Sequence, residues 1–353
     1  MSDIDAPSAP REGETLDGAK LEAYLHGAVA GFAGPITVAQ FPKGHSNLTY
    51  LVTSPTHELV LRRPPFGSKV KSAHDMGREH RILSRLAGHY PAPKPLALCE
   101  DEAVLGATFY VMERTRGVIL RKDLPPDLAL SPADVRRLDE GLIDRLVELH
   151  ALPYAAIGLG DLGKPEGYVE RQIAGWTKRY AASRTDDVPA VDEVAAWLEA
   201  HRPPDVAPTL IHNDFKLDNV VLAPDDPTRI IAVLDWEMST IGDPLMDLGT
   251  TLSYWLDPDD DDALQTIRWA PTTVAGSLTR RELAARYAER SGRDLTNVLF
   301  YYAFGLFKTS VVLQQIYYRY KQGLTKDPRF GALILGVHVL ATTASQAIAR
   351  GTI

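Results

Sequence analysis

The feature that most constrains this chain is a short segment in its middle, residues 210–237. Two apolar runs, 220–222 and 230–234, are joined by a turn that carries two prolines and two aspartates. Apolar runs of this length around such a turn predict a β-hairpin. A hairpin brings the polar residues before its first strand close to Asp235, which follows its second strand.

Three oxygen-bearing side chains are expected to converge at the open end of this hairpin: Asp214, Asn219 and Asp235. Two carboxylates and a carboxamide are ligands that suit Mg²⁺ better than a softer metal. Such a set also leaves one carboxylate free to orient a hydroxyl nucleophile. Lys216, two residues after Asp214, is placed to reach a transferred phosphoryl group. The alternative is a polar loop with a capping aspartate beside a solvated hairpin.

A second pair of charges is predicted in the N-terminal third. The strand pattern 58–62 ends at Arg62, and a helix is expected over 72–86, where Glu79 falls on the apolar stripe. A buried carboxylate is costly unless a cation pairs with it, and Arg62 is the expected partner. Alternation along the strand places Arg63 on the opposite face, so either arginine remains a candidate to contact phosphates. The alternative is that Glu79 reaches solvent from the edge of the stripe.

The motif from His212 to Asn219, followed by Asp235-Trp236-Glu237, resembles the catalytic loop and metal motif of a known family. It is similar to protein kinases and, more closely, to the aminoglycoside phosphotransferase and choline kinase relatives. The strand end 61–65, the helix start 72–75 and the segments 78–83 and 317–320 resemble the phosphotransferase-like domain that is fused to some acyl-CoA dehydrogenases. The resemblance covers roughly residues 25–350.

The resemblance implies an α+β, bilobal, protein-kinase-like fold, with a small β-rich N-terminal lobe, one key helix and a larger helical C-terminal lobe. We expect a flexible tail over 1–18, a nucleotide-binding lobe over 19–116 and a helical lobe over 117–353 that carries the catalytic loop and the substrate pocket. Apolar periodicity predicts hairpins over 48–62 and 96–105, and a strand over 108–112. It predicts helices from Ser131 onward and over 167–183, 189–201, 243–256, 279–291, 295–321 and 330–349.

The resemblance also implies which residues would bind a nucleotide. Ser46 and Asn47 lie in the turn that covers the phosphates in this family, and Arg62 and Glu79 stand at the phosphate-gripping pair. Residues Met112, Glu113 and Thr115 occupy the strand end that presents backbone groups to the base. Two further positions, His212 and Asp247, match residues that brace the catalytic loop.

The function implied is transfer of the γ-phosphoryl of ATP, with GTP as the alternative, to a hydroxyl of a small molecule. In that reaction Asn219 and Asp235 hold Mg²⁺, Asp214 accepts the hydroxyl proton and Lys216 steadies the phosphoryl group. A nucleotide-binding pseudokinase is the main alternative. The acceptor stays open between a hydroxyacyl compound and an aminoglycoside-like alcohol. The acidic run 257–262 fits either a cationic substrate or a solvated loop.

Composition bears on the partners of the protein, on its cellular compartment and on a possible membrane span. Lysine and arginine total 38 against 46 acidic residues, a net charge of −8, which disfavours nucleic acid and anionic membrane as partners. The single cysteine, Cys99, cannot form an internal disulfide and suits a reducing compartment, so we expect a cytoplasmic protein. The apolar stretch 330–349 contains His338 and other polar residues, which favours a mostly buried helix over a membrane span. No obligate protein partner is evident.

Overall fold

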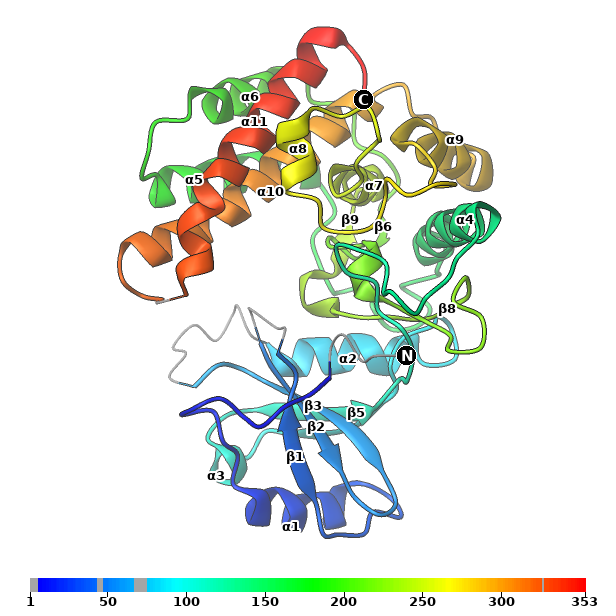
Figure 1. Cartoon of the computed structure of the whole chain (residues 1–353), viewed down its shortest axis with the longest axis vertical. Helices are drawn as coiled ribbons and strands as arrows, with labels where there is room; N and C mark the ends of the chain where they lie inside the picture. The colour runs from blue at the N-terminus through cyan, green and yellow to red at the C-terminus, as the bar shows by residue number, and fades with distance from the viewer. Residues whose placement is uncertain (1–5, 43–46, 67–74, 326) are drawn as a thin grey trace.

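The computed structural model describes residues 6–42, 47–66, 75–325 and 327–353. Its N-terminal part is a five-stranded antiparallel sheet in the order β1-β2-β3-β5-β4 (Figure 1). The strands are β1 (Thr37–Gln40), β2 (Leu48–Thr53), β3 (Glu58–Arg63), β4 (Pro95–Cys99) and β5 (Phe109–Glu113). The predicted hairpin of β2 and β3 is confirmed by their antiparallel register, in which Leu51 lies opposite Val60.

The two faces of this sheet pack against different parts of the molecule. Along β3, Leu59 and Leu61 belong to a core shared with helix α1 (Gly18–Ala28), whereas Val60 belongs to the main core with helix α2 (Met76–Leu86). Because side chains alternate along a strand, Arg62 follows Val60 on the face toward α2. The sheet therefore aims one arginine at the C-terminal part of the chain.

The C-terminal part is mostly helical (Figure 1). Its helices are α4 (Pro132–His150), α5 (Tyr168–Ser183), α6 (Pro189–Ala200), α7 (Pro244–Ser253), α8 (Asp262–Thr266), α9 (Arg280–Ser291), α10 (Val298–Lys321) and α11 (Leu333–Arg350). Two small sheets interrupt them: β6 (Thr209–Ile211) pairs with β9 (Thr240–Gly242), and β7 (Val220–Leu222) pairs with β8 (Ile230–Val233). The predicted hairpin over 220–234 is confirmed.

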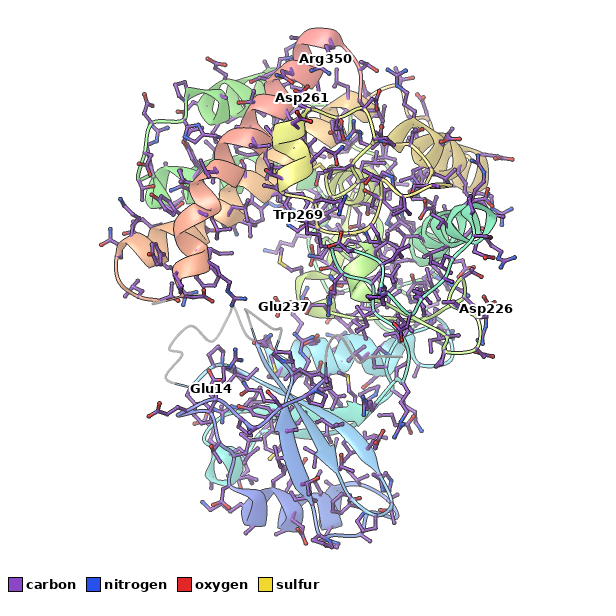
Figure 2. The ribbon with its side chains drawn as sticks, in the orientation of Figure 1. Glu14, Asp226, Glu237, Asp261, Trp269 and Arg350 are labelled. Atoms are coloured by element: carbon purple, nitrogen blue, oxygen red, sulfur yellow. The ribbon has the colours of Figure 1, made fainter. Side chains whose placement is uncertain are left out.

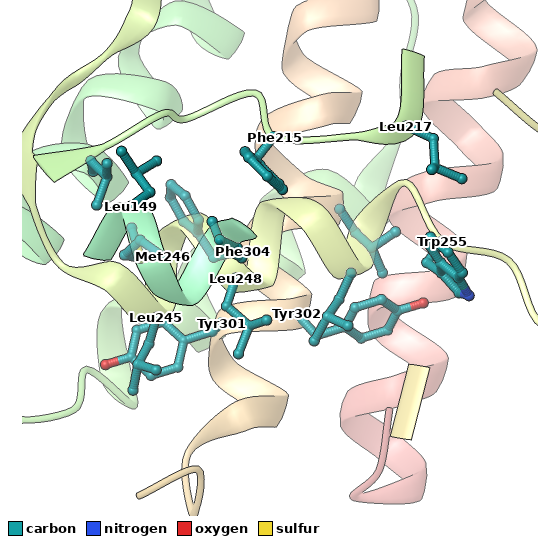
Figure 3. Packing of buried hydrophobic residues seen from close by; sticks show 14 of the residues in the cluster. Leu149, Phe215, Leu217, Leu245, Met246, Leu248, Trp255, Tyr301, Tyr302 and Phe304 are labelled. Atoms are coloured by element: carbon teal, nitrogen blue, oxygen red, sulfur yellow. The ribbon is translucent and has the colours of Figure 1, made fainter. Parts of the chain in front are cut away.

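Helices α7 and α10 form the centre of this part, where large side chains from several elements interlock (Figure 3). The two helix backbones approach closely at Gly249 and Gly305. A Cβ on Gly249 would collide with the Tyr301 backbone, and one on Gly305 would collide with the Gly249 backbone. Because both positions lack a side chain, α10 can lie directly beneath α7 and the loop before β7.

Several expectations were wrong in detail. The predicted hairpin over 96–105 is strand β4 followed by a short helix, α3 (Glu102–Leu105), which Asp101 caps.

Helix α1 was not predicted, and part of the segment expected to be a flexible tail contacts the sheet. Ser8 pairs with Gln40, and the carbonyl of Glu14 accepts a 2.7 Å hydrogen bond from Tyr50. Specific contacts with the sheet hold these residues in place.

The C-terminal helix is less buried than expected. The segment Pro328–Arg350 is long and apolar enough to cross a membrane by length and composition, and only a third of its apolar window is buried. Helix α11 packs on α10 and α6 with Val337, Leu340 and Ala344 buried, while Leu335 is 65% exposed. The prediction of a mostly buried helix was therefore wrong, because the other face of α11 has no packing partner among the described residues.

Candidate functional site

A cavity of about 600 Å³ lies between the sheet and the helical part. It is lined by one face of the sheet, by the segment that follows β5, and by the two loops that flank the β7–β8 hairpin. The predicted residues among its lining are Asn47, Arg62, Glu79, Met112, Glu113, Thr115, Lys216, Asn219 and Asp235. Most of the predicted site residues are thus brought together in one cavity.

Arg62 is the centre of the charge cluster in this cavity. Its guanidinium lies 2.9 Å from a carboxylate oxygen of Glu79, 3.0 Å from Asp235 and 3.5 Å from Glu237. Figure 2 shows Glu237 at the junction of the two parts of the molecule. The predicted contact between Arg62 and Glu79 is present, and Arg62 also bridges from the sheet to the loop after β8.

Burial shapes the charges of this cluster. The Glu79 side chain is 1% exposed, and its burial raises its pKa despite the opposing charge of Arg62. Burial would raise the pKa of Asp235 too, but the charge and hydrogen bond of Arg62 outweigh it and hold the pKa below its usual value. Desolvation opposes the charge of Arg62, and the surrounding carboxylates, Glu79 first, raise its pKa well above the ordinary range. Arg62 therefore stays charged.

Arg63 lies on the opposite face, as strand alternation predicts. Its guanidinium donates to the backbone oxygens of Leu105 and Pro64 at 3.1 Å each and stacks 3.6 Å from the centre of the Phe66 ring. It does not line the cavity. Of the two arginines, only Arg62 is placed to meet a ligand there.

The β7–β8 hairpin positions Asn219 and Asp235. In its register Val220 lies opposite Val233, and the amide of Leu234 donates to the carbonyl of Asn219 at 2.8 Å. Asp235 adopts a left-handed conformation with φ of 69°, which is uncommon for a residue other than glycine and turns the chain sharply after the strand. About a third of the Asp235 side chain is exposed, and both residues line the cavity.

Asp214 lies on the loop before the hairpin and is held by three side chains. One carboxylate oxygen accepts hydrogen bonds from Asn219 Nδ2 at 2.9 Å and lies 3.2 Å from Lys216 Nζ. The other accepts a hydrogen bond from the Tyr254 hydroxyl at 2.8 Å. The carboxylate is therefore fixed in direction from two sides.

Lys216 is set between acidic groups. Its ammonium also lies 3.7 Å from Asp218 and 4.7 Å from the centre of the Tyr254 ring. Burial would lower its pKa, but the charge of Asp214 and the other neighbours outweighs burial and raises it. The lysine is a permanent cation that lines the cavity.

Asp247, in the first turns of α7, braces the loop before β7 through the loop's backbone. Its two oxygens accept hydrogen bonds from the backbone amides of His212 and Asn213 at 2.7 Å each, and His150 contacts the same carboxylate at 3.2 Å. His212 contacts the carbonyl of Leu234 at 2.9 Å and so ties the loop to the end of β8. Both residues support the loop backbone.

The nucleotide-binding candidates lie in different surroundings. Asn47 donates to Glu237 at 2.5 Å, and Glu113 is exposed and paired with Lys94 at 3.0 Å. Met112 and Thr115 line the cavity. Ser46, expected beside Asn47, lies outside the described residues.

Two residues near Asp214 were not predicted. Tyr254 carries no local sequence pattern that links it to a loop 40 residues earlier, and an aromatic at helical spacing is more often part of the core. Lys308 is buried in α10 and donates to the carbonyl of Asn213 at 2.5 Å. It is the single charged residue in the otherwise uncharged stretch 298–318, and that was the signal that could have identified it.

The acidic run 257–262 has a structural use that neither earlier alternative anticipated. Arg280 lies 2.6 Å from Asp260 and 3.5 Å from Asp257, and all three side chains are largely buried. The Asp257 carboxylate also accepts the backbone amide of Arg280 at 2.9 Å. These two acids hold the start of α9 in place.

Comparison with protein families and curated proteins places the chain among known relatives. The model of the phosphotransferase enzyme family matches residues 37–289. The chain is 36% identical to acyl-CoA dehydrogenase family member 10 of Mus musculus over 303 residues, and 36% identical to family member 11 of Rattus norvegicus over 319 residues. These matches cover 85% and 86% of this chain but only 28% and 39% of the relatives.

Solved structures give the same fold. One is a Ralstonia eutropha protein that is provisionally named an aminoglycoside phosphotransferase. It aligns with a TM-score of 0.80 and 34% identity, and the alignment covers 95% of this chain and 99% of that one. Choline kinase of Cryptosporidium parvum gives 0.64 at 12% identity, covering 95% and 96%. An aminoglycoside phosphotransferase solved with AMP-PNP and hygromycin B gives 0.59 at 19%, covering 94% and 99%. The predicted bilobal, protein-kinase-like α+β fold is confirmed.

Proposed function

The chain belongs to the phosphotransferase enzyme family, and we propose that it transfers the γ-phosphoryl group of ATP to a hydroxyl of a small molecule in a Mg²⁺-dependent reaction. The observation that carries this proposal is one cavity that gathers Arg62, Asn219, Asp235 and Lys216, with Asp214 fixed beside them. Phosphoryl transfer asks little covalent chemistry of a protein and depends on positioning and charge neutralisation. These are the properties of this cavity.

Arg62, supported by Glu79, would grip the α- and β-phosphates. A guanidinium stays charged and presents several donors in a fixed plane, so one edge can bind Glu79 while another meets phosphate oxygens. Its present contact with Asp235 at 3.0 Å indicates that a polyanion would compete with that carboxylate for the same donor. Asn47, Met112, Glu113 and Thr115 line the rest of the proposed nucleotide site.

The donor set fits Mg²⁺. Asn219 uses its amide nitrogen to bind Asp214, which directs its oxygen away from that bond, and Asp235 presents a partly exposed carboxylate to the same cavity. Hard oxygen donors of this kind suit Mg²⁺, which is bound in such sites through one or two protein groups and the phosphates. When bound there, the ion would neutralise charge on the phosphate oxygens.

Asp214 is the proposed base. Its carboxylate would orient the acceptor hydroxyl and take its proton as the oxygen attacks, and its hydrogen bond with Tyr254 at 2.8 Å would keep it pointing the right way. Lys216, permanently charged beside Asp214, would steady the transferred phosphoryl group. A pseudokinase fits less well, because Asp214, Asn219 and Asp235 are all present and in place.

The relatives suggest two acceptor classes. The curated relatives are named acyl-CoA dehydrogenase family members, which favours a hydroxyacyl compound, whereas the solved neighbour with hygromycin B favours an aminoglycoside-like alcohol. The run 257–262 could attract a cationic aminoglycoside, but two of its acids, Asp257 and Asp260, already pair with Arg280. We therefore rank the hydroxyacyl compound first. ATP is the proposed donor, with GTP as the alternative.

The test is nucleotide consumption against a panel of hydroxy-acids, hydroxyacyl-CoAs, aminoglycosides, choline and sugars, with ATP and GTP as donors. The wild-type protein should consume ATP in the presence of one acceptor class and Mg²⁺, and the product should contain one new phosphate ester by mass. Asp214→Asn serves as the matched control and should lose the acceptor-dependent rate. Mg-ATP binding without turnover on any acceptor or on water would favour the pseudokinase.

A further inference from the structure

Lys308 is a buried cation that the proposed reaction leaves unused. It lies on α10, its side chain is among the buried polar groups at 5% exposure, and its ammonium donates to the backbone oxygen of Asn213 at 2.5 Å. The Trp176 ring centre lies 6.0 Å away. Among the described residues, no carboxylate lies within ion-pair distance of this lysine. Burial of an ammonium without such a partner is costly.

Asn213, the residue that Lys308 holds, directly precedes Asp214. Its φ is 66°, a left-handed conformation that only a few residues other than glycine adopt and that costs free energy unless the surroundings enforce it. All four of its polar groups have partners. Its amide donates to Asp247 and its carbonyl accepts from Lys308, while its side chain contacts the Tyr168 hydroxyl at 3.3 Å and the Met238 carbonyl at 3.0 Å.

This turn determines where Asp214 points. A left-handed residue reverses the local direction of the chain, so relaxation of Asn213 would swing the next side chain away from Tyr254 and Asn219. Three of the four contacts on Asn213 involve groups that remain unchanged over ordinary pH. Lys308 is the exception, because burial lowers its pKa to about 8 even though the charges of Asp214 and Asp247 oppose that shift.

The charged groups around Lys308 are few. The catalytic loop contributes Asp214 and Lys216, and α7 contributes Asp247. Helix α5 presents the Trp176 ring to Lys308. The guanidinium of Arg179 lies over the same ring, 4.6 Å from its centre. The titratable side chains of α6 and α11 are exposed to solvent: Asp192, Glu193, Glu199, His338 and Arg350. Burial and the charge of Lys216 therefore lower the pKa of Lys308, and the carboxylates of Asp214 and Asp247 oppose them.

We propose that Lys308 is a positioning residue of the phosphotransferase, whose protonated amine holds the Asn213 carbonyl and thereby keeps Asp214 directed at the acceptor hydroxyl. The proposal rests on the function proposed above. A charge-assisted hydrogen bond is roughly twice as strong as a neutral one, so loss of the proton weakens the restraint on the loop. Turnover should be full below the pKa of Lys308 and should fall as pH rises through it.

Stability should respond in the opposite direction. Because the pKa of Lys308 is lower in the folded than in the unfolded chain, the unfolded state binds more protons between the two values, and stability rises with pH in that range. Replacement of the lysine by an apolar side chain of similar length should therefore stabilise the fold at pH 7 while lowering turnover. If the lysine served only to stabilise the fold, the same replacement would lower stability.

The experiment compares Lys308→Met and Lys308→Arg with the wild type and with Lys321→Met, an exposed lysine on the same helix. Mg-ATP hydrolysis with water as acceptor is measured from pH 6.5 to 9.5, together with Mg-ATP affinity and melting temperature. Wild-type hydrolysis should fall about tenfold between pH 7 and pH 9, the loss expected from one group that titrates at about 8. Lys321→Met should match it throughout.

Lys308→Met should be about tenfold slower at pH 7, with no pH dependence to pH 9, unchanged Mg-ATP affinity and a melting temperature higher by about 2–4 °C. The arginine of Lys308→Arg stays charged, so the hydrolysis rate of this variant should stay constant up to pH 9.5. The proposal is overturned if either variant keeps the wild-type alkaline fall. It is also overturned if Lys308→Met melts lower and loses rate only in proportion to lost folded protein.

A separate readout distinguishes this proposal from the function on which it rests. If the wild type hydrolyses no ATP and phosphorylates nothing, the proposed function fails, and the restraint is then measured by hydrogen exchange of the segment 210–218. Exchange, corrected for its intrinsic pH dependence, should accelerate with a midpoint near pH 8 in the wild type and not in Lys308→Arg. Identical profiles in the two proteins would overturn the role of Lys308.

Discussion

The two sides of the site bury a cation in opposite ways. On the proposed nucleotide side, Arg62 lies within 3.5 Å of three carboxylates, and its pKa is raised well above the ordinary range. On the proposed acceptor side, Lys308 faces a backbone carbonyl, and burial lowers its pKa to about 8. Arg62 therefore stays charged at every physiological pH, whereas Lys308 can lose its proton as the pH rises through about 8.

The difference follows from what each side must do. A nucleotide brings several negative charges, so the receiving groups must be permanently charged and already held by partners that phosphate can replace. Under the proposed function, the acceptor side must instead direct one carboxylate, Asp214, toward a hydroxyl. That requires a fixed backbone, which Asp247 and Lys308 supply through Asn213. Substitutions on each side test this difference in roles.

The largest effect is expected at Asp214. Asp214→Asn keeps the shape of the side chain and its neighbours but loses the group that accepts the proton. Its kcat should fall by roughly 10²–10⁴, the range typical of general acid–base groups. Steady-state kinetics with the identified acceptor checks this. A kcat within threefold of the wild type would remove Asp214 from the acceptor side.

Nucleotide binding should stabilise the fold only when the metal is present. Mg-ATP at a hundred times its dissociation constant should add about 2.7 kcal/mol to the free energy of unfolding, because Asn219 and Asp235 need the ion to tolerate triphosphate charge. ATP with a chelator should stabilise much less. Thermal denaturation measures both, and equal stabilisation with and without Mg²⁺ would contradict the role given to Asp235.

A smaller effect is expected at Glu79. Glu79→Gln removes the 2.9 Å ion pair with Arg62 but leaves Asp235 and Glu237 beside the guanidinium. The loss should be about 1–2 kcal/mol of stability, with weaker Mg-ATP binding. Glu148→Gln, which breaks the exposed pair with Arg145, is the control and should change neither quantity appreciably. Two variants that behave alike would mean that the buried pair does not organise the nucleotide side.

The smallest effect is expected at Tyr254. Tyr254→Phe removes one hydroxyl that donates to Asp214 at 2.8 Å. Since burial raises the pKa of this phenol, the hydroxyl remains a donor at any working pH. Its loss should lower kcat about fivefold and leave Mg-ATP affinity intact. Tyr50→Phe, whose hydroxyl bonds the Glu14 carbonyl in the sheet, is the matched control. An effect on affinity instead of kcat would move Tyr254 to the nucleotide side.

The nucleotide side was largely predictable from sequence because its signals are local. A strand that ends in Arg62, a helix that carries Glu79 on its apolar stripe and a hairpin that ends in Asp235 each follow from short patterns. The short helix α3 after β4 was not predicted, because a four-residue helix has too few positions to reveal its period.

The acceptor side was less predictable because its parts come from distant segments. Tyr254 and Lys308 follow Asp214 by 40 and 94 residues, and no local pattern couples them to it. Their approach depends on how α7 and α10 pack, which is governed by the glycine contact at Gly249 and Gly305. Such packing is a property of the folded core and leaves no periodic trace in the sequence.

The most direct test of the division between the two sides is Mg-ATP affinity measured in parallel for Asp214→Asn and Asp235→Asn by titration calorimetry. Asp214 is assigned to the acceptor side and Asp235 to the metal side. Asp214→Asn should bind Mg-ATP within about twofold of the wild type, while Asp235→Asn should bind at least tenfold more weakly. Loss of binding in Asp214→Asn with wild-type affinity in Asp235→Asn would contradict this assignment and reverse the two roles.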